Sequence, residues 1–232
     1  MTDTVDIADV SEGKATAVRP GVYSRGSDTV DAILKAALHV LIEEGAAAFS
    51  LRRIAAQCGL KVGNVSYHFP RKELLVQLLL EEMLISYESL LDETARQPGL
   101  TAEQRLAQVV TLCLDDIRTK RTTHLFTELW ALANHNEFVA ERVAVFYRYV
   151  HDIIATFVAQ LNPTLEQKDV EAVALFISST MEGTTTFCGF GKPWEAMMPQ
   201  IKAITIKAMI DLAKSVRAED IHGLSAPQNQ AG

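Results

Sequence analysis

Hydrophobic residues recur at every third or fourth position along most of this chain, and this spacing predicts a series of amphipathic helices. In the first of them, Ile33, Ala37 and Leu41 fall on one face. The helices that we expect cover residues 28–44, 50–58, 71–95, 101–117, 123–134, 137–161, 166–190 and 194–216, with one more short helix that starts at Lys61 and ends before Arg71. No segment alternates with the period of two that a half-buried strand requires, so the expected fold class is all-α.

Capping residues mark several of the expected helix ends. Asp28, Ser50 and Thr101 carry oxygens that can accept a hydrogen bond from the first turn of a helix. Gly45 suits the left-handed residue that follows a helix. These residues divide the hydrophobic pattern into separate helices with short connections.

Neither end of the chain shows a sustained period. Residues 1–25 are expected to form a disordered arm, in which Arg19 and Arg25 either reach DNA or are simply solvated. Residues 219–232 are expected to form a flexible tail.

Length and composition indicate a globular protein of a reducing compartment. Hydrophobic residues make up 48% of the 232 positions, which is sufficient for a sizeable core. The three cysteines, Cys58, Cys113 and Cys188, are odd in number and far apart, which favours free thiols. The chain has neither a secretory signal nor an apolar stretch of membrane-spanning length, so we expect a cytoplasmic protein without a membrane partner.

The charge is distributed unevenly. A net charge of −7 argues at first against nucleic acid as a partner. The segment from Arg25 to Lys72, however, contains seven basic and four acidic residues, whereas the chain from Glu73 onward contains 13 basic and 21 acidic residues. A mildly basic N-terminal part followed by an acidic body predicts two functional halves.

The segment from Ser50 to Lys72 has the residue types of a helix-turn-helix. Ala55 is small enough for two helices to cross closely, and Gly59 can adopt the left-handed backbone of the turn between them. Apolar Ile54, Leu60 and Val65 would hold the pair against the preceding helix.

This frame directs another set of side chains outward, toward a DNA groove. The amide of Asn64 can pair with the N6 and N7 edge of adenine, Val62 can contact a thymine methyl, and Gly63 permits close approach of the backbone. Phosphate contacts are expected for Tyr67, His68 and Lys72.

The pattern S-L-R-R-I-A-A-x-x-G-L-x-V-G-N-V-S-Y-H-F-P-x-K-E-x-L resembles the N-terminal domain of the TetR family of bacterial transcriptional regulators. The resemblance runs from Ile33 to Met83 and implies a three-helix DNA-binding head, a helical ligand-binding body and a homodimer that reads palindromic operator DNA. The residues that it places at DNA are Arg52, Val62, Gly63, Asn64, Ser66, Tyr67, His68 and Lys72, and Lys61 at the start of the second helix is a further DNA-binding candidate. Two of them depart from the family pattern: Lys61 stands where a Ser or Thr cap is usual, and Ser66 where an aromatic residue is common.

The resemblance also suggests a division into domains. Residues 26–72 would be the helix-turn-helix domain, 73–218 the effector-binding and dimerisation domain, and the helix 71–95 the connection between them. A small-molecule effector entering the body would release the head from its operator, as expected of a repressor.

Large apolar residues mixed with a few polar ones suggest where an effector could bind. The candidates are Cys113, Phe126, Trp130, Tyr147, His151, Met181 and Phe187, with ordinary core packing as the alternative for each. The last two long helices are the expected dimer interface, or else close the core of one protomer. The interface candidates are Phe176, Ile177, Ile201, Ile204, Met209 and Leu212.

A helical-bundle enzyme or metal-binding protein is the contrasting hypothesis. His124 and Glu128 lie four residues apart on one helix face, and Asp115 and Asp116 add carboxylates nearby. No second His-x-x-x-Glu or Glu-x-x-His motif completes such a site, and no nucleophile stands beside a recognisable base. We therefore expect no catalysis, no metal and no cofactor.

Overall fold

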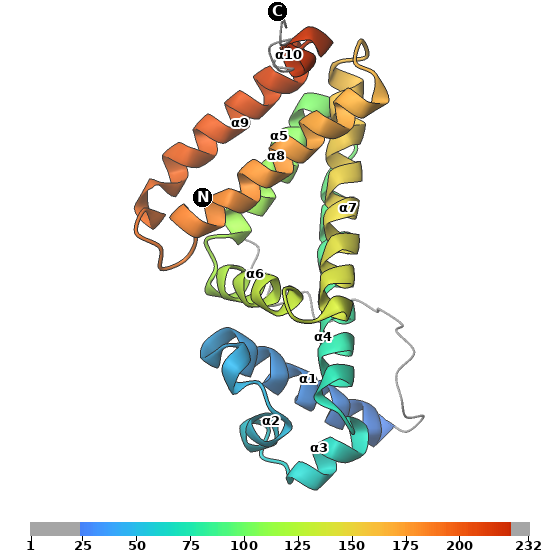
Figure 1. The fold of residues 1–232 in the computed structure, drawn as a ribbon, viewed down its shortest axis with the longest axis vertical. Coiled ribbons are helices and arrows are strands. Elements are labelled where there is room, and N and C mark those ends of the chain that lie inside the picture. The colour runs from blue at the N-terminus through green and yellow to red at the C-terminus, as the bar shows by residue number, and fades with distance from the viewer. Residues whose placement is uncertain (1–23, 224–232) are drawn as a thin grey trace, which may run out of the picture. The chain divides into compact units, whose positions relative to one another are not determined.

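The computed structural model describes residues 24–223, and every regular element in that range is helical (Figure 1). The α-helices are α1 (Ser24–Glu44), α2 (Leu51–Gln57), α3 (Val62–His68), α4 (Lys72–Ala95), α5 (Ala102–Asp116), α6 (Lys120–Ala133), α7 (Glu137–Leu161), α8 (Gln167–Cys188), α9 (Met198–Ser215) and α10 (Ala218–His222). Two 3-10 segments, η2 (Ala46–Ala48) and η3 (Glu195–Met197), precede α2 and α9. The expected all-α fold class is confirmed.

Helix α5 begins where its capping residues predict. The Thr101 hydroxyl accepts a hydrogen bond from the Gln104 backbone nitrogen at 3.2 Å, and the Gln104 side chain accepts one from the Thr101 nitrogen at 2.9 Å. This reciprocal capping box satisfies two backbone donors that a helix otherwise leaves open. The predicted start at Thr101 is confirmed.

The first helix begins earlier than its sequence suggested. It starts at Ser24, so Asp28 lies inside the helix instead of capping it, and Arg25 of the expected arm is helical. An aspartate near the start of a helix is compatible both with a cap and with the positive end of the helix dipole, and the sequence pattern did not separate the two. The rest of the expected arm, 1–23, lies outside the described residues.

Helix α6 also begins earlier, at Lys120 instead of Thr123. The Thr122 backbone nitrogen donates to the Thr119 hydroxyl at 3.2 Å, which is the hydrogen bond of an N-cap. Thr119 thus caps the helix one residue before Lys120.

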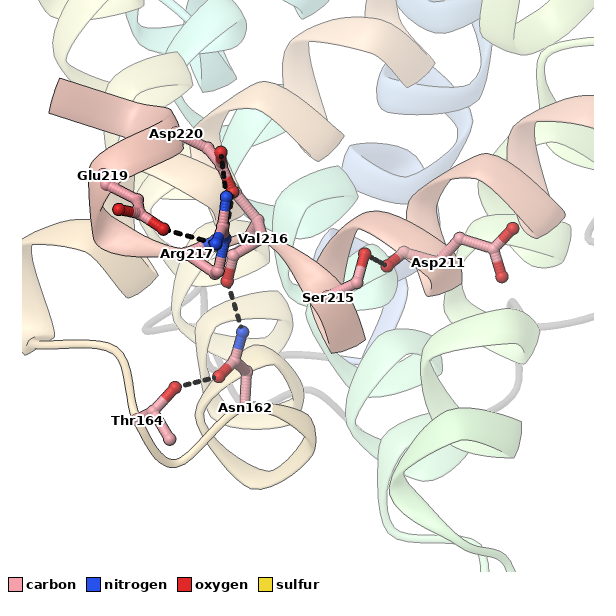
Figure 2. A network of polar contacts seen from close by, with 8 residues as sticks. All are labelled: Asn162, Thr164, Asp211, Ser215, Val216, Arg217, Glu219 and Asp220. Carbon is pink, nitrogen blue, oxygen red and sulfur yellow. Dashed lines mark hydrogen bonds and ion pairs between the residues drawn. The ribbon is translucent and has the colours of Figure 1, made fainter. Parts of the chain in front are cut away.

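The expected flexible tail is wrong in its first part, because Ala218–His222 form α10. Figure 2 shows how this end is fastened: the Asn162 amide donates to the Val216 carbonyl at 2.8 Å, and the Arg217 nitrogen donates to the Asp220 carboxylate at 3.0 Å. Asn162 is 6% exposed, and its hydrogen bond to Val216, the C-cap of α9, is partly buried. The remainder of the tail, 224–232, lies outside the described residues.

The chain divides into two compact units. The first contains the described part of Met1–Leu90 together with His124–Ala144, and the second contains Leu91–Thr123 with the described part of Val145–Gly232. The expected domain boundary between residues 72 and 73 does not follow this division. Most of α4 and α6 belong to the first unit, because the buried side chains of Leu80, Leu125 and Leu129 pack into its core.

None of the helices among residues 24–223 combines the length and the apolar composition that crossing a bilayer requires.

Candidate nucleic-acid interface

Ser50 sets the start of α2. Its backbone is extended, with φ −143° and ψ 150°, and its hydroxyl accepts a hydrogen bond from the Arg53 nitrogen at 3.3 Å. The predicted N-cap is therefore confirmed.

Gly59 makes the turn between α2 and α3. Its φ is 69°, in the left-handed region, and the following Leu60 nitrogen donates to the Ala55 carbonyl at 2.9 Å. A Cβ atom on Gly59 would meet nothing within 4 Å, so glycine is needed for its backbone conformation and not for space. Ile54 and Ala55 are buried, as the helix-turn-helix pattern predicted.

Val65 and Phe69 anchor α3 in the core of the first unit, since both are almost fully buried. This anchoring decides which residues face outward. Val62 is 43% exposed and Tyr67 82%, while Gly63 and Asn64 are exposed and Ser66 is partly buried. The predicted faces are confirmed for Val65 inward and for Val62, Gly63, Asn64 and Tyr67 outward, but not for Ser66. Contact of the outward residues with DNA remains a prediction.

Lys61 occupies the N-cap position of α3 and makes no side-chain hydrogen bond to the first turn. An ammonium group only donates, so it cannot accept from the backbone N–H groups as Ser or Thr would. The exposed lysine instead adds a positive charge at the N-terminal end of α3, next to Val62 and Gly63.

Gly63 is not required by the fold. Its φ is not positive, and a Cβ atom added there would meet nothing within 4 Å. A glycine inside a helix destabilises it by roughly 0.5–1 kcal/mol relative to alanine. The residue therefore makes sense as a place where something outside the protomer approaches the backbone closely.

The adjacent arginines of α2 have different surroundings. Arg53 donates to the Glu44 carboxylate at the end of α1, and this hydrogen bond raises the pKa of Arg53 and lowers the pKa of Glu44. Arg52, in contrast, is exposed. The sequence singled out Arg52 alone, and in the structure Arg53 joins α2 to the end of α1 through Glu44.

A cationic and aromatic cluster lies between α3 and the start of α4. Tyr67 and His68 make an edge-to-face ring contact, with centroids 5.2 Å apart. Arg71 and Lys72 are exposed at the beginning of α4, whose first backbone N–H groups form the positive end of a long helix. Cationic side chains and a helix N-terminus together suit binding of phosphate groups.

The effector candidates do not all belong to one unit. Phe126 and Trp130 lie in the first unit, where their ring centroids are 6.4 Å apart. The remaining candidates, Cys113, Tyr147, His151, Met181 and Phe187, lie in the second. Phe187 is 56% exposed, and its role in an effector site stays a prediction.

The second unit contains an internal carboxylate that the sequence reading missed. Burial raises the pKa of Glu182 on α8 to about 7. A hydrogen bond with the Tyr147 side chain lowers this pKa, and the negative charge of Asp116 raises it. Burial also raises the pKa of the neighbouring Cys113 thiol. Glu182 is the single charged residue between Glu171 and Lys192, and that isolation in an apolar helix was the available signal.

Two of the dimer candidates are already buried within the protomer. Ile177 is 0% and Met209 6% exposed, so neither can lose much surface to a partner, and their assignment to an interface is wrong. Both helices are apolar on more than one face, which left the inward face undetermined. Ile201 and Leu212 are partly buried, whereas Phe176 and Ile204 are 53% and 64% exposed.

The pair considered for a metal, His124 and Glu128, faces the end of α1. Both side chains lie within hydrogen-bonding distance of backbone atoms there. Within residues 24–223, no group of three or more His, Cys, Asp or Glu side chains could hold a metal ion.

Comparisons with known proteins bear on both parts of the chain. Residues 33–79 match a family model described as bacterial regulatory proteins, tetR family, and residues 102–211 match one described as BetI-type transcriptional repressor, C-terminal. A curated relative from Xanthobacter autotrophicus, described as an uncharacterized HTH-type transcriptional regulator in the dhlA 5′ region, is 28% identical over 150 residues. The match covers 62% of this chain and 72% of that protein.

Solved structures of similar fold include a transcriptional regulator from Rhodococcus sp. RHA1, with a TM-score of 0.68 and 18% identity over 82% of this chain and 100% of that one. A TetR-family transcriptional regulator from Streptomyces coelicolor has a TM-score of 0.67 and 16% identity, over 82% of this chain and 97% of that one. Identities this low establish a shared fold and nothing finer.

Proposed function

The chain belongs to the TetR family of bacterial transcriptional regulators, and from this membership we propose that it is a repressor that binds a palindromic operator as a homodimer and leaves it when a small molecule binds. The observation that carries the DNA-binding part is the exposed face of α3, where Gly63 leaves open space beside Val62 and Asn64. An α-helix fits the major groove, and a glycine on the approaching face reduces the distance between the backbone and the bases.

The proposed contacts fall into two classes. Asn64 and Val62 would read base edges, because an amide can pair with adenine and an apolar group with a thymine methyl. Arg52, Tyr67, His68 and Lys72 would bind phosphates and would therefore position the head without selecting a sequence. Lys61 and Ser66, which depart from the family pattern, would contribute to the choice of operator.

The homodimer is supported by an exposed apolar face on the last long helices. Leu175 and Phe176 on α8 and Ile204 on α9 are each more than half exposed. On α8, exposed Gly183 has open space where a Cβ would be, although a mid-helix glycine weakens the helix. A second copy packed closely against this face would account for both features, and it would present two heads to successive major grooves roughly 34–36 Å apart.

The effector site is proposed for the interior of the second unit, around Tyr147, Met181 and Glu182. An effector releases the operator only if it binds the released conformation more tightly than the DNA-bound one. Action on operator DNA would place the protein in the bacterial cytoplasm.

Selection of genomic fragments with the purified protein tests the proposal. We expect enrichment of a small set of fragments that share a palindrome, and their neighbouring genes would indicate the effector. On the enriched operator, Asn64→Ala should weaken binding by at least tenfold, the cost of about 1.4 kcal/mol, while binding to random duplex stays within about twofold. Equal affinity of the wild-type protein for operator and random DNA would refute the proposal.

A further inference from the structure

The C-terminal end of α1 is held by two side chains of α6. Nδ1 of His124 lies 2.8 Å from the Ile42 carbonyl oxygen, and the Glu128 carboxylate accepts a hydrogen bond from the Ala46 nitrogen at 2.9 Å. A carbonyl oxygen only accepts, so His124 carries its proton on Nδ1. Each pair joins residues that are 82 positions apart in the sequence.

These two contacts satisfy backbone groups that the end of a helix leaves open. The Ile42 carbonyl belongs to the last turn of α1, and the Ala46 nitrogen opens η2. Between them, Gly45 has φ 79°, and a Cβ atom there would lie 3.1 Å from the Glu128 carboxylate oxygen. Glycine therefore serves both the left-handed turn and the close approach of Glu128.

The same end of α1 is tied to the helix-turn-helix. Glu44, next to Gly45, accepts two hydrogen bonds from Arg53 of α2. Residues 42–46 thus contact both α6 and α2. A rotation of α6 cannot leave these bonds intact without moving the end of α1.

The first turn of α6 is held within the second unit. The Thr122 hydroxyl donates to the Asp116 carboxylate at 2.7 Å, and the Thr123 hydroxyl donates to the Ile117 carbonyl at 2.7 Å. The next residue, His124, already belongs to the first unit.

We propose that His124 and Glu128 are positioning residues for DNA recognition, which orient the helix-turn-helix by holding the end of α1 against α6. This inference rests on the proposed function. The pair forms a latch, defined by His124–Ile42 and Glu128–Ala46. Opening the latch loosens the orientation of α2 and α3 but removes none of their phosphate-binding side chains.

The test measures binding of the full-length protein to the selected operator and to a random duplex of equal length, by fluorescence anisotropy at fixed salt. Glu128→Ala should weaken operator binding about tenfold and random-duplex binding less than about twofold, because oriented base readout depends on the latch more than phosphate contact does. Glu128→Gln should recover most of the affinity, since its amide oxygen can still accept from Ala46. Glu137→Ala, which removes an exposed carboxylate in the same unit, is the matched control and should bind as the wild type does.

Hydrogen exchange of the free protein gives an independent readout. Peptides covering 42–57 should exchange faster in Glu128→Ala than in Glu128→Gln or Glu137→Ala, because the Ala46 amide loses its acceptor. Faster exchange with unchanged operator affinity would overturn the inference, since the latch would then be structural only. An equal loss of operator and random-duplex binding would also overturn it. In both cases the wild type still selects an operator, which distinguishes them from failure of the proposed function.

Discussion

Arg53 of α2 holds Glu44 at the end of α1 through two hydrogen bonds, from Nε at 2.8 Å and from Nη2 at 2.5 Å. Its neighbour Arg52 is exposed on the same short helix. Two adjacent arginines thus have separate tasks: Arg53 pairs with Glu44 within the head, and Arg52 is available to phosphate.

This difference predicts that replacing Arg52 and replacing Arg53 affect the salt dependence of DNA binding differently. Arg52→Ala should weaken operator and random-duplex binding alike and reduce the slope of log affinity against log salt by about 1, because one phosphate contact is lost. Arg53→Ala should weaken operator binding with little change in that slope. Titrations at four or more salt concentrations measure both quantities. Identical slopes for the two variants would contradict the assignment.

The Glu44–Arg53 pair also predicts an acid-sensitive contribution to the stability of the head. Because the pKa of Glu44 is lowered in the folded state, its contribution is present above its ordinary pKa of 4.5 and is lost as the pH falls through the lowered value. Thermal melts of wild type and Glu44→Gln should therefore differ at pH 7 and converge in acid. A difference that grows toward low pH would contradict this sign.

Gly63→Ala should separate DNA recognition from folding. Open space around the position and ordinary helical φ mean that alanine fits, so the free energy of unfolding should stay equal or rise by roughly 0.5–1 kcal/mol. Operator binding should fall by tenfold or more, which corresponds to about 1.4 kcal/mol, because a methyl group would intrude into the proposed groove contact. Denaturant unfolding and anisotropy provide the two measurements. If Gly63→Ala binds operator as well as the wild type does, the inference that DNA closely approaches the backbone at Gly63 is wrong.

Gly183→Leu should disrupt the proposed homodimer without unfolding the protomer. The glycine is exposed and has open space around it in the protomer, whereas a closely packed partner helix would meet the new side chain. Sedimentation equilibrium should show a dimer dissociation constant raised by at least about tenfold. Ala131→Leu, at an exposed position of α6, is the control and should leave the constant unchanged. If Gly183→Leu dimerises normally, the partner surface lies elsewhere.

Glu182 predicts a loss of stability as the pH rises toward neutrality. Its folded pKa of about 7 exceeds the ordinary 4.5, so the folded state favours the protonated carboxyl. The associated stability is full below about pH 4.5 and is lost as the pH rises through 7, by an amount on the order of 2–3 kcal/mol. Glu182→Gln should therefore be more stable than the wild type at pH 8 and similar at pH 5, in denaturant titrations. Glu171→Gln, on an exposed position of the same helix, should show no such difference.

Much of the candidate interface was predictable because its determinants are local. Ser50 caps α2 and Gly59 forms the turn as expected, since a cap or a left-handed residue is defined by neighbours within about four positions. The outward face of α3 followed from Val65 alone: once that residue is buried, the helical period directs Gly63, Asn64 and Tyr67 to solvent.

Other assignments required the packing of helices that lie far apart in the chain. Phe176 and Ile177 are adjacent and similarly apolar, yet one is 53% exposed and the other fully buried. Helix α8 is apolar on more than one face, so its own pattern does not select the inward one.

The helical periodicity, the caps and the turn of the head follow from the order of the amino acids, because each depends on backbone conformation and hydrogen bonds over a few residues. The roles of His124 and Glu128 do not: their spacing of four residues fits a metal site, a solvated helix face or an internal contact equally well. Their partners, Ile42 and Ala46, lie 82 residues earlier in the chain. Only the packing of α6 against the end of α1 brings these groups within hydrogen-bonding distance, and that packing depends on the buried surfaces of both helices together.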